Sequence, residues 1–85
     1  MYRVLLRPPA QKFIRKLRDK TLTGKLVTAM RGLAESPRSP GSEKLAGPEG
    51  LYRIRIGDYR IIYQIKDDLL LVLVVKIGHR REVYR

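Results

Sequence analysis

Three arginines that could bind an anion lie in the second half of the chain, at positions 53, 55 and 60, on either side of Gly57-Asp58. If Gly57-Asp58 is a two-residue hairpin loop, Arg55 stands directly opposite Arg60 on the neighbouring strand. Because side chains alternate along a strand, Arg53 shares that face. Like charges opposed across strands destabilise a sheet by roughly 0.2–1 kcal/mol, and an anion between them would remove this cost. The pattern therefore predicts an anion site, with a solvated strand face as the alternative.

A second cluster follows near the C-terminal end: His79, Arg80, Arg81 and Tyr84. We expect Gly78 to release the chain from the last strand, so that this cluster reaches the edge of the arginines. Histidine titrates near neutral pH, which makes His79 either a proton carrier or an ordinary surface group. Tyr84 either anchors the packing or stacks on a nucleobase. A single histidine without any cysteine cannot form a metal site, so we expect no metal and no cofactor.

The strands that must position these residues follow residue 50, where the period of the apolar side chains becomes two. They are predicted at residues 51–56, 59–66 and 69–77. A second two-residue loop at Asp67-Asp68 would pair Ile62 with Leu73 and Arg60 with Val75. The end of the last strand would then lie beside the arginine hairpin.

Residues 2–37 are predicted to form one strand and two helices. The strand, at 2–7, ends at Pro8-Pro9, a pair that suits the first turn of a helix. Residues 19–23 offer capping side chains for a second helix, which ends at Ser36-Pro37. Both helices carry apolar residues at helical spacing, namely Ala10, Phe13, Ile14 and Leu17 in the first and Leu26, Ala29, Met30, Leu33 and Ala34 in the second. Residues 37–50, rich in proline and glycine, are predicted to be a connecting loop.

The predicted order β-α-α-β-β-β indicates an α+β fold, in which a helix hairpin packs on one face of a small four-stranded, largely antiparallel sheet. We expect one domain, residues 1–85, because a chain of this length has room for one core. The helices would cover Ile54, Ile61, Tyr63, Ile65, Leu70, Val72 and Val74. The opposite face of the sheet would expose Ile62, Leu71, Leu73, Val75 and Ile77 to solvent. This favours an acidic, amphipathic protein partner, with strand one or the C-terminal segment as the alternative cover.

The chain is strongly basic: nineteen Lys and Arg against eight Asp and Glu give a net charge of +11. Such a field attracts polyanions, which favours nucleic acid or the ribosome over a membrane surface or a merely basic soluble domain. The longest apolar run, residues 69–75, is far shorter than the roughly 20 residues that cross a bilayer. The N-terminal residues do not resemble a secretion signal. We therefore expect a cytoplasmic protein.

Three segments carry a resemblance to a known family: KLAG at 44–47, GLYRIRIGDYRIIY at 50–63 and GHRREVY at 78–84. They resemble the RelE family of toxins, and the likeness in length and element order extends over the whole chain. The resemblance implies the toxin of a type II toxin–antitoxin system, held inactive by a RelB-like antitoxin. It also implies a ribosome-dependent endoribonuclease that cuts messenger RNA in the A site without a metal. In this reaction the 2′-hydroxyl of the message attacks the adjacent phosphate and leaves a cyclic phosphate.

The resemblance also assigns roles to single residues. Arg60 and Arg80 match the phosphate-stabilising arginines of the family, and Tyr84 matches the tyrosine that stacks on the base. Arg53 and Arg55 stand where members often carry lysine. Because arginine stays protonated, it cannot readily act as a general base, so we expect these two to clamp phosphate only.

His79 would then handle a proton, and Arg81 and Lys44 are further candidates for RNA or ribosome contact. Two other functions stay open. One is inhibition of DNA gyrase without nucleolysis, as in the related ParE toxins, which share the fold. The other is a basic RNA-binding module that does not cleave. The combination of arginines, a histidine and a tyrosine favours cleavage, because a gyrase inhibitor has no phosphate to break.

Overall fold

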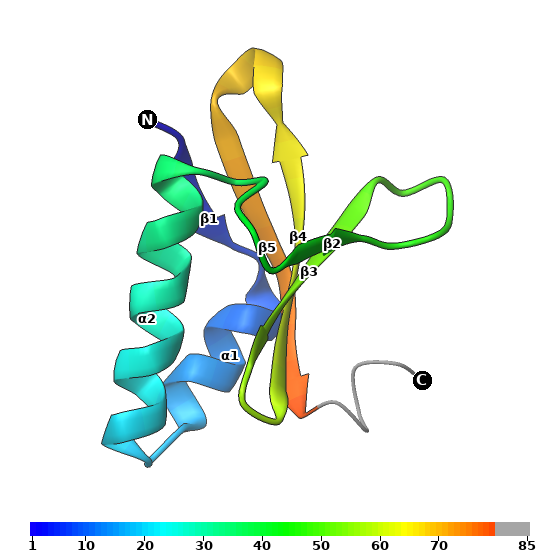
Figure 1. The fold of residues 1–85 in the computed structure, drawn as a ribbon. Coiled ribbons are helices and arrows are strands. Elements are labelled where there is room, and N and C mark those ends of the chain that lie inside the picture. The colour runs from blue at the N-terminus through cyan, green and yellow to red at the C-terminus, as the bar shows by residue number, and fades with distance from the viewer. Residues whose placement is uncertain (80–85) are drawn as a thin grey trace.

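The computed structural model describes residues 1–79. Figure 1 shows two helices lying together on one side of a twisted sheet. In chain order the elements are β1 Arg3–Leu6, α1 Pro8–Lys16, α2 Lys20–Glu35, β2 Ser42–Lys44, β3 Leu51–Ile56, β4 Tyr59–Lys66, the 3₁₀ turn η1 Asp67–Leu69 and β5 Leu71–His79.

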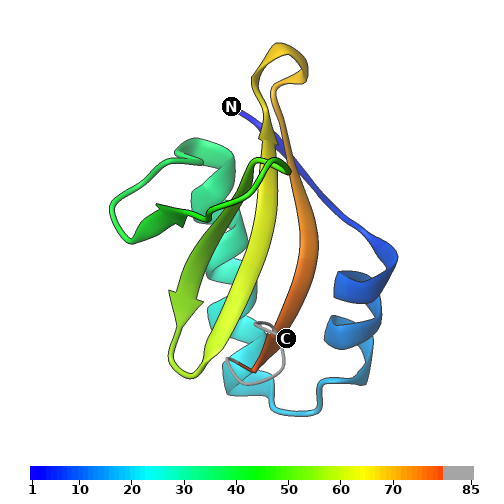
Figure 2. The ribbon, with the colours of Figure 1, turned by 90° about the vertical axis from the view of Figure 1, so that its right-hand side faces the viewer.

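The sheet has five strands in the order β1-β5-β4-β3-β2. β1 runs parallel to β5, and the other neighbours are antiparallel. Figure 2 looks onto the side of the sheet that faces away from the helices, with α2 behind the strands and α1 to their right. We call the side covered by α1 and α2 the helix face and the opposite side the outer face. The predicted α+β fold is confirmed.

The prediction of four strands and of a loop over residues 37–50 was wrong at β2. Residues 42–44 add an edge strand, with Glu43 opposite Arg53 and Lys44 opposite Tyr52. A strand of three polar residues has no apolar alternation that the sequence could reveal. Its existence depends on the neighbouring edge of β3.

Both helices form where local chemistry predicted them. α1 begins at Pro8, whose fixed φ suits a first helical turn. α2 begins after Asp19, whose side chain accepts a hydrogen bond from the Leu22 amide at 3.1 Å, and it ends directly before Ser36. No helix within residues 1–79 combines the length and the apolar character needed to cross a membrane.

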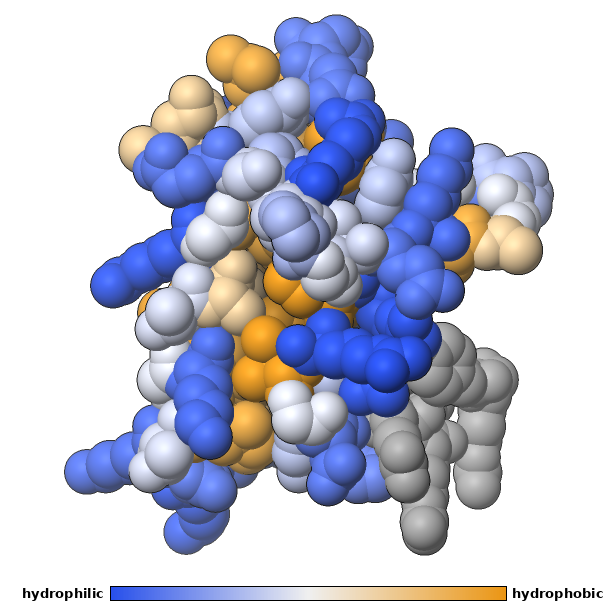
Figure 3. Space-filling model, viewed as in Figure 1, coloured by the Kyte–Doolittle hydropathy of each residue, from blue (hydrophilic) through white to orange (hydrophobic). Residues whose placement is uncertain are grey.

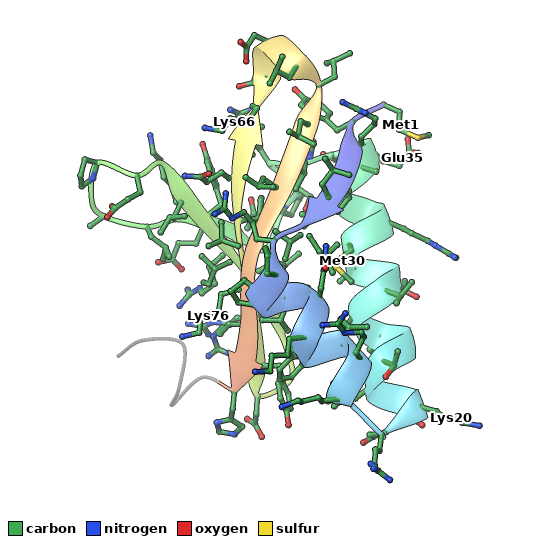
Figure 4. All side chains as sticks on the ribbon, turned by 180° about the vertical axis from the view of Figure 1, so that it is seen from behind. Met1, Lys20, Met30, Glu35, Lys66 and Lys76 are labelled. Atoms are coloured by element: carbon green, nitrogen blue, oxygen red, sulfur yellow. The ribbon has the colours of Figure 1, made fainter. Side chains whose placement is uncertain are left out.

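The core lies between the helices and the helix face of the sheet. Met30, for example, points inward from α2 (Figure 4). The fully or nearly buried members come from both layers: Ala10, Leu26, Met30, Leu33, Ile61, Tyr63, Val72, Val74 and Ile77. The Tyr63 hydroxyl stays satisfied, because it donates a hydrogen bond to the Pro37 carbonyl at 2.7 Å. The predicted pattern of apolar side chains that face the core, in both helices and in β4, is thus confirmed.

The connection between β4 and β5 differs from the predicted two-residue loop. Lys66 pairs with Leu71, so residues 67–70 form the loop, with Leu70 in a left-handed conformation at φ 48°. Leu70 is 52% exposed instead of covered by the helices. The longer loop shifts the register, so that Gln64 rather than Ile62 pairs with Leu73.

A β-bulge in β5 shifts the register once more, between Ile62 and Tyr63 of β4. Tyr63 pairs with Val74 but Ile62 pairs with Lys76, so Val75 is the extra residue. Beyond the bulge, Ile77 turns to the helix face, where it is 3% exposed, although it was predicted on the other face. Lys76 points away from the helices (Figure 4). Arg60 consequently pairs with Gly78 and not with Val75.

A polar network ties the far end of the sheet to the loop after α2. Arg38 donates from Nη1 and Nη2 to the two carboxylate oxygens of Asp67 at 3.0 and 2.8 Å. The Tyr2 hydroxyl donates to the same carboxylate at 2.6 Å, and Arg38 also lies 5.7 Å from the centre of the Tyr52 ring. The hydrogen bonds from Arg38 and then from Tyr2 lower the pKa of Asp67 from 3.8 to about 2.

This pKa shift predicts an acid-sensitive contribution to stability. The ionised Asp67 stabilises the fold above its ordinary pKa of 3.8, and the contribution is lost as the pH falls through the lowered value of about 2. We expect Asp67→Asn to lower the melting temperature at pH 7 and the difference from wild type to shrink toward pH 2. Thermal melts across this range measure it. Asp68→Asn is the control, and an equal loss from both variants would contradict the assignment.

Candidate functional site

The β3–β4 hairpin has the register that its sequence predicts. Gly57 takes a φ of 60° and starts a two-residue loop of type II′, which places glycine first. Ile56 pairs with Tyr59, and Arg55 stands directly opposite Arg60. Ile54 and Ile61 face the helices, so the two arginines project from the outer face. Arg55 is exposed there.

Arg60 is a nearly buried guanidinium without a counter-ion among residues 1–79. It is 6% exposed, and its Nη1 donates to the carbonyl oxygens of Tyr59 and Gly57 at 3.1 and 3.4 Å. Its Nε is buried, and no hydrogen-bond acceptor in the described part of the chain reaches it. A buried charge of this kind is costly unless it is paired. An anion bound at the outer face would neutralise this charge.

Arg53 lies on the same face but is already neutralised. It is 8% exposed, and its Nη2 forms an ion pair with Oε2 of Glu43, the residue opposite it on β2. Glu43 is not among the predicted site residues, because residues 37–50 were predicted to be a loop. The only sequence signal is a carboxylate close to a series of arginines, which has meaning once β2 is known to pair with β3.

His79 is not brought into the arginine cluster. It is the last residue of β5 and pairs with Tyr59, whose ring it meets edge-on at 5.5 Å between ring centroids. Tyr59 packs against the core and lies 5.9 Å from the Phe13 ring, so His79 shares the helix face. Gly78 does not release the chain, because it continues the strand opposite Arg60. The end of β5 lies beside the hairpin as predicted, but the ring of His79 lies on the helix face, next to Tyr59.

Lys44 pairs with Tyr52 and therefore belongs to the helix face, opposite in direction to Glu43. It is exposed, but it does not join the arginines. The predicted site residues Arg80, Arg81 and Tyr84 lie outside the described residues. Within residues 1–79, no group of three or more histidine, aspartate or glutamate side chains gathers as a metal site would require.

The outer face is less bare than predicted. Ile62, which stands opposite Arg53, is 6% exposed, while Leu71, Leu73 and Val75 are partly buried. A different apolar surface is hollowed between α2 and β3, where orange side chains show near the centre of Figure 3, to the right of α2. This groove of about 710 Å³ is lined by Ile54 and Ile56 of the strand and by small residues of α2 such as Gly24, Ala29 and Gly32.

Comparison with known proteins places the chain in a family. The family described as "ParE toxin of type II toxin-antitoxin system, parDE" matches residues 4–84. The mRNA interferase toxin RelE of Escherichia coli (strain K12) is 35% identical over 79 residues, which cover 88% of this chain and 81% of that protein. The chain belongs to the RelE/ParE superfamily of toxins.

Solved structures agree with this membership. The isolated E. coli RelE toxin superposes with a TM-score of 0.81 at 33% identity, over 99% of this chain and 92% of that one. The archaeal RelE–RelB complex from Pyrococcus horikoshii OT3 gives a TM-score of 0.81 at 27% identity, over 95% and 97% of the two chains. The chain is therefore a RelE-type toxin of this superfamily.

The opposed arginines predict a gain in stability on removing one charge. We expect Arg55→Thr to raise the free energy of unfolding by up to about 1 kcal/mol, because threonine suits a strand and removes the repulsion from Arg60. Denaturant unfolding at low salt measures it. Lys66→Thr is the matched control, since Lys66 faces Leu71 and no cation. A lower stability of Arg55→Thr than of this control would contradict the interpretation.

Proposed function

We propose that this toxin is a ribosome-dependent endoribonuclease that cuts messenger RNA in the A site. The observation that carries the proposal is Arg60, buried on the outer face without a carboxylate partner among residues 1–79 and directly opposite the exposed Arg55. A phosphodiester at this place satisfies both guanidinium groups. The likeness to a protein named mRNA interferase toxin RelE supports the same activity.

The chemistry we propose needs no metal. The 2′-hydroxyl of the message attacks the neighbouring phosphorus, and negative charge builds on the phosphate oxygens in the transition state. Positive groups held in place before the reaction stabilise this charge without reorganising. Arg60 is held in this way, because its Nη1 is anchored to the carbonyl oxygens of Gly57 and Tyr59. Arg55 adds a second charge from the solvent side.

The remaining predicted residues keep their proposed roles. Arg80 stabilises the phosphate, Tyr84 stacks on a base, and Arg81 and Lys44 contact RNA or the ribosome. The proposal that His79 carries a proton now has to account for its place beside Tyr59 on the helix face. His79→Phe keeps a ring against Tyr59 but cannot titrate, so unchanged cleavage by this variant would remove His79 from the mechanism.

Inhibition of DNA gyrase is the second candidate, because the matching family is named after ParE. A fold neighbour described as a YoeB/ParE toxin from Agrobacterium tumefaciens superposes with a TM-score of 0.79 at 16% identity, which supports the fold alone. A shared fold does not decide between the two activities. Arg60, which finds no carboxylate among residues 1–79, favours phosphodiester cleavage, since a protein target offers no scissile phosphate.

We propose a RelB-like antitoxin as the partner, in a toxin–antitoxin hetero-oligomer. Solved relatives are complexes of this kind, including the intact RelBE complex of E. coli, which superposes with a TM-score of 0.80 at 31% identity. The net charge of +11 favours an acidic partner, and the apolar groove between α2 and β3 can receive an amphipathic helix. Action on the ribosome would place the toxin in the cytoplasm.

Replacing Arg60 tests the proposed function. We expect Arg60→Ala to lower the rate of message cleavage about 100- to 1,000-fold, the usual cost of losing a group that stabilises transition-state charge. Arg60→Lys should fall between this variant and wild type, because it keeps the charge without the fork of donors. The assay is primer extension on a message translated with purified toxin.

Arg31→Ala is the matched control, since it removes an exposed arginine from α2. Circular dichroism must show that all variants are folded. Cuts confined to translated codons, and lost with Arg60, support the endonuclease. Supercoiling inhibition without cuts supports a gyrase inhibitor, and ribosome or RNA binding with neither effect supports a binding module. Both of these results contradict the proposal.

A further inference from the structure

We propose that Glu43 is the proton acceptor of the cleavage reaction and takes the proton of the attacking 2′-hydroxyl. This inference rests on the proposed function. The arginines on the outer face can hold the phosphate, but they cannot accept a proton, because arginine stays protonated in proteins. A carboxylate is ionised at neutral pH and can accept one. Glu43 brings such a group to the arginine cluster.

The sheet register places Glu43 at the rim of this cluster. Glu43 on β2 is directly opposite Arg53 on β3, and the ion pair between Oε2 and Nη2 joins them. Arg55 follows two positions after Arg53 and therefore projects from the same face. Glu43 and Arg55 are therefore diagonal neighbours on adjacent strands, which lie roughly 7–8 Å apart, a span that one phosphate and its ribose fill. Arg60 lies one strand further away, directly opposite Arg55.

Burial separates the roles of the two paired residues. The side chain of Arg53 is 10% exposed and that of Glu43 is 61% exposed. Arg53 therefore holds the carboxylate from the protein side, while the carboxylate itself stays accessible to RNA. Only Oε2 takes part in the ion pair, and within residues 1–79 no hydrogen bond reaches Oε1. Activation of a nucleophile requires a base that a second group holds in orientation, and Arg53 would hold Glu43 in this way.

The other acids near the hairpin do not fit this role. Asp58 belongs to the loop itself, but it lines a hollow with Thr21 and Lys25 of α2, which lies on the helix face. Asp67 is bound by Arg38 and Tyr2 at the other end of β4. Glu43 is the acid within residues 1–79 that forms an ion pair with an arginine of the cluster.

The proposed step balances. The O2′–H proton moves to Glu43 as the O2′–P bond forms, and the P–O5′ bond breaks. The leaving 5′-oxygen takes a proton from water, and the products are a 2′,3′-cyclic phosphate and a 5′-hydroxyl. Protonated Glu43 then returns its proton to water. Arg55 and Arg60 balance the charge on the phosphate throughout.

Glu43→Gln tests the proposal, because it keeps the size of the side chain and an oxygen for Arg53 but is not basic. We expect single-turnover cleavage at saturating toxin to fall about 100- to 10,000-fold, the range for losing general base catalysis. Binding to programmed ribosomes should stay the same or become tighter, since a negative charge beside the phosphate is removed. Asp58→Asn should cleave at the wild-type rate.

A second variant separates catalysis from structure. Glu43→Ala should regain activity with added formate or acetate, and the rescued rate should rise with the basicity of the added carboxylate. If the wild-type toxin cleaves and the Glu43→Gln variant cleaves at a rate within about threefold of it, the proposal is wrong. It is also wrong if the Glu43→Gln variant loses ribosome binding as much as cleavage, which would indicate a structural ion pair. Wild type that does not cleave at all refutes the proposed function itself, whatever Glu43 does.

Discussion

The charge of Arg60, for which residues 1–79 supply no carboxylate, is the constraint around which the outer face is organised. The β3–β4 hairpin holds this guanidinium at 6% exposure, opposite a second arginine, and supplies it with carbonyl acceptors only. Such an arrangement raises the energy of the folded protein. The rigid core on the helix face, with Ile61 fully buried beside Arg60 in β4, keeps the hairpin in this register. This arrangement lowers the stability of the fold, but it holds two guanidinium groups where an anion can bind.

Arg53 and Arg60 lie on the same face and are nearly equally buried, but they differ in their ion pairing. Arg53 receives a carboxylate from the edge strand β2, whereas Arg60 receives none from residues 1–79. This asymmetry divides the face into a neutralised half, next to β2, and a cationic half, next to β5. The second half attracts anions, and the carboxylate of Glu43 lies on the neutralised half. The outer face therefore carries both signs of charge.

The fold does not distinguish the activities known for this superfamily. Proteins described as RelE and as YoeB/ParE superpose on the chain almost equally well, with TM-scores of 0.81 and 0.79, although their identities to it are 33% and 16%. Two helices covering one face of a twisted sheet satisfy the same packing rules whatever the outer face carries. Function is decided by side chains that contribute little to the core. The ion pair of Arg38 with Asp67 likewise belongs to the scaffold and lies at the other end of β4 from Arg60.

Local patterns in the sequence determined most of the framework. Proline at the start of α1, the Asp19 cap of α2 and the glycine-first turn at Gly57 act within a few residues, so both helices and the Arg55–Arg60 register were predictable. The existence of β2 and of the bulge that turns Ile77 inward became visible only in the tertiary structure. Both depend on the pairing partner, because an edge strand or an extra residue is stabilised by its neighbour and leaves no period of its own. For the same reason Glu43 and His79 could not be placed from the sequence: their sides of the sheet are set by pairing across strands.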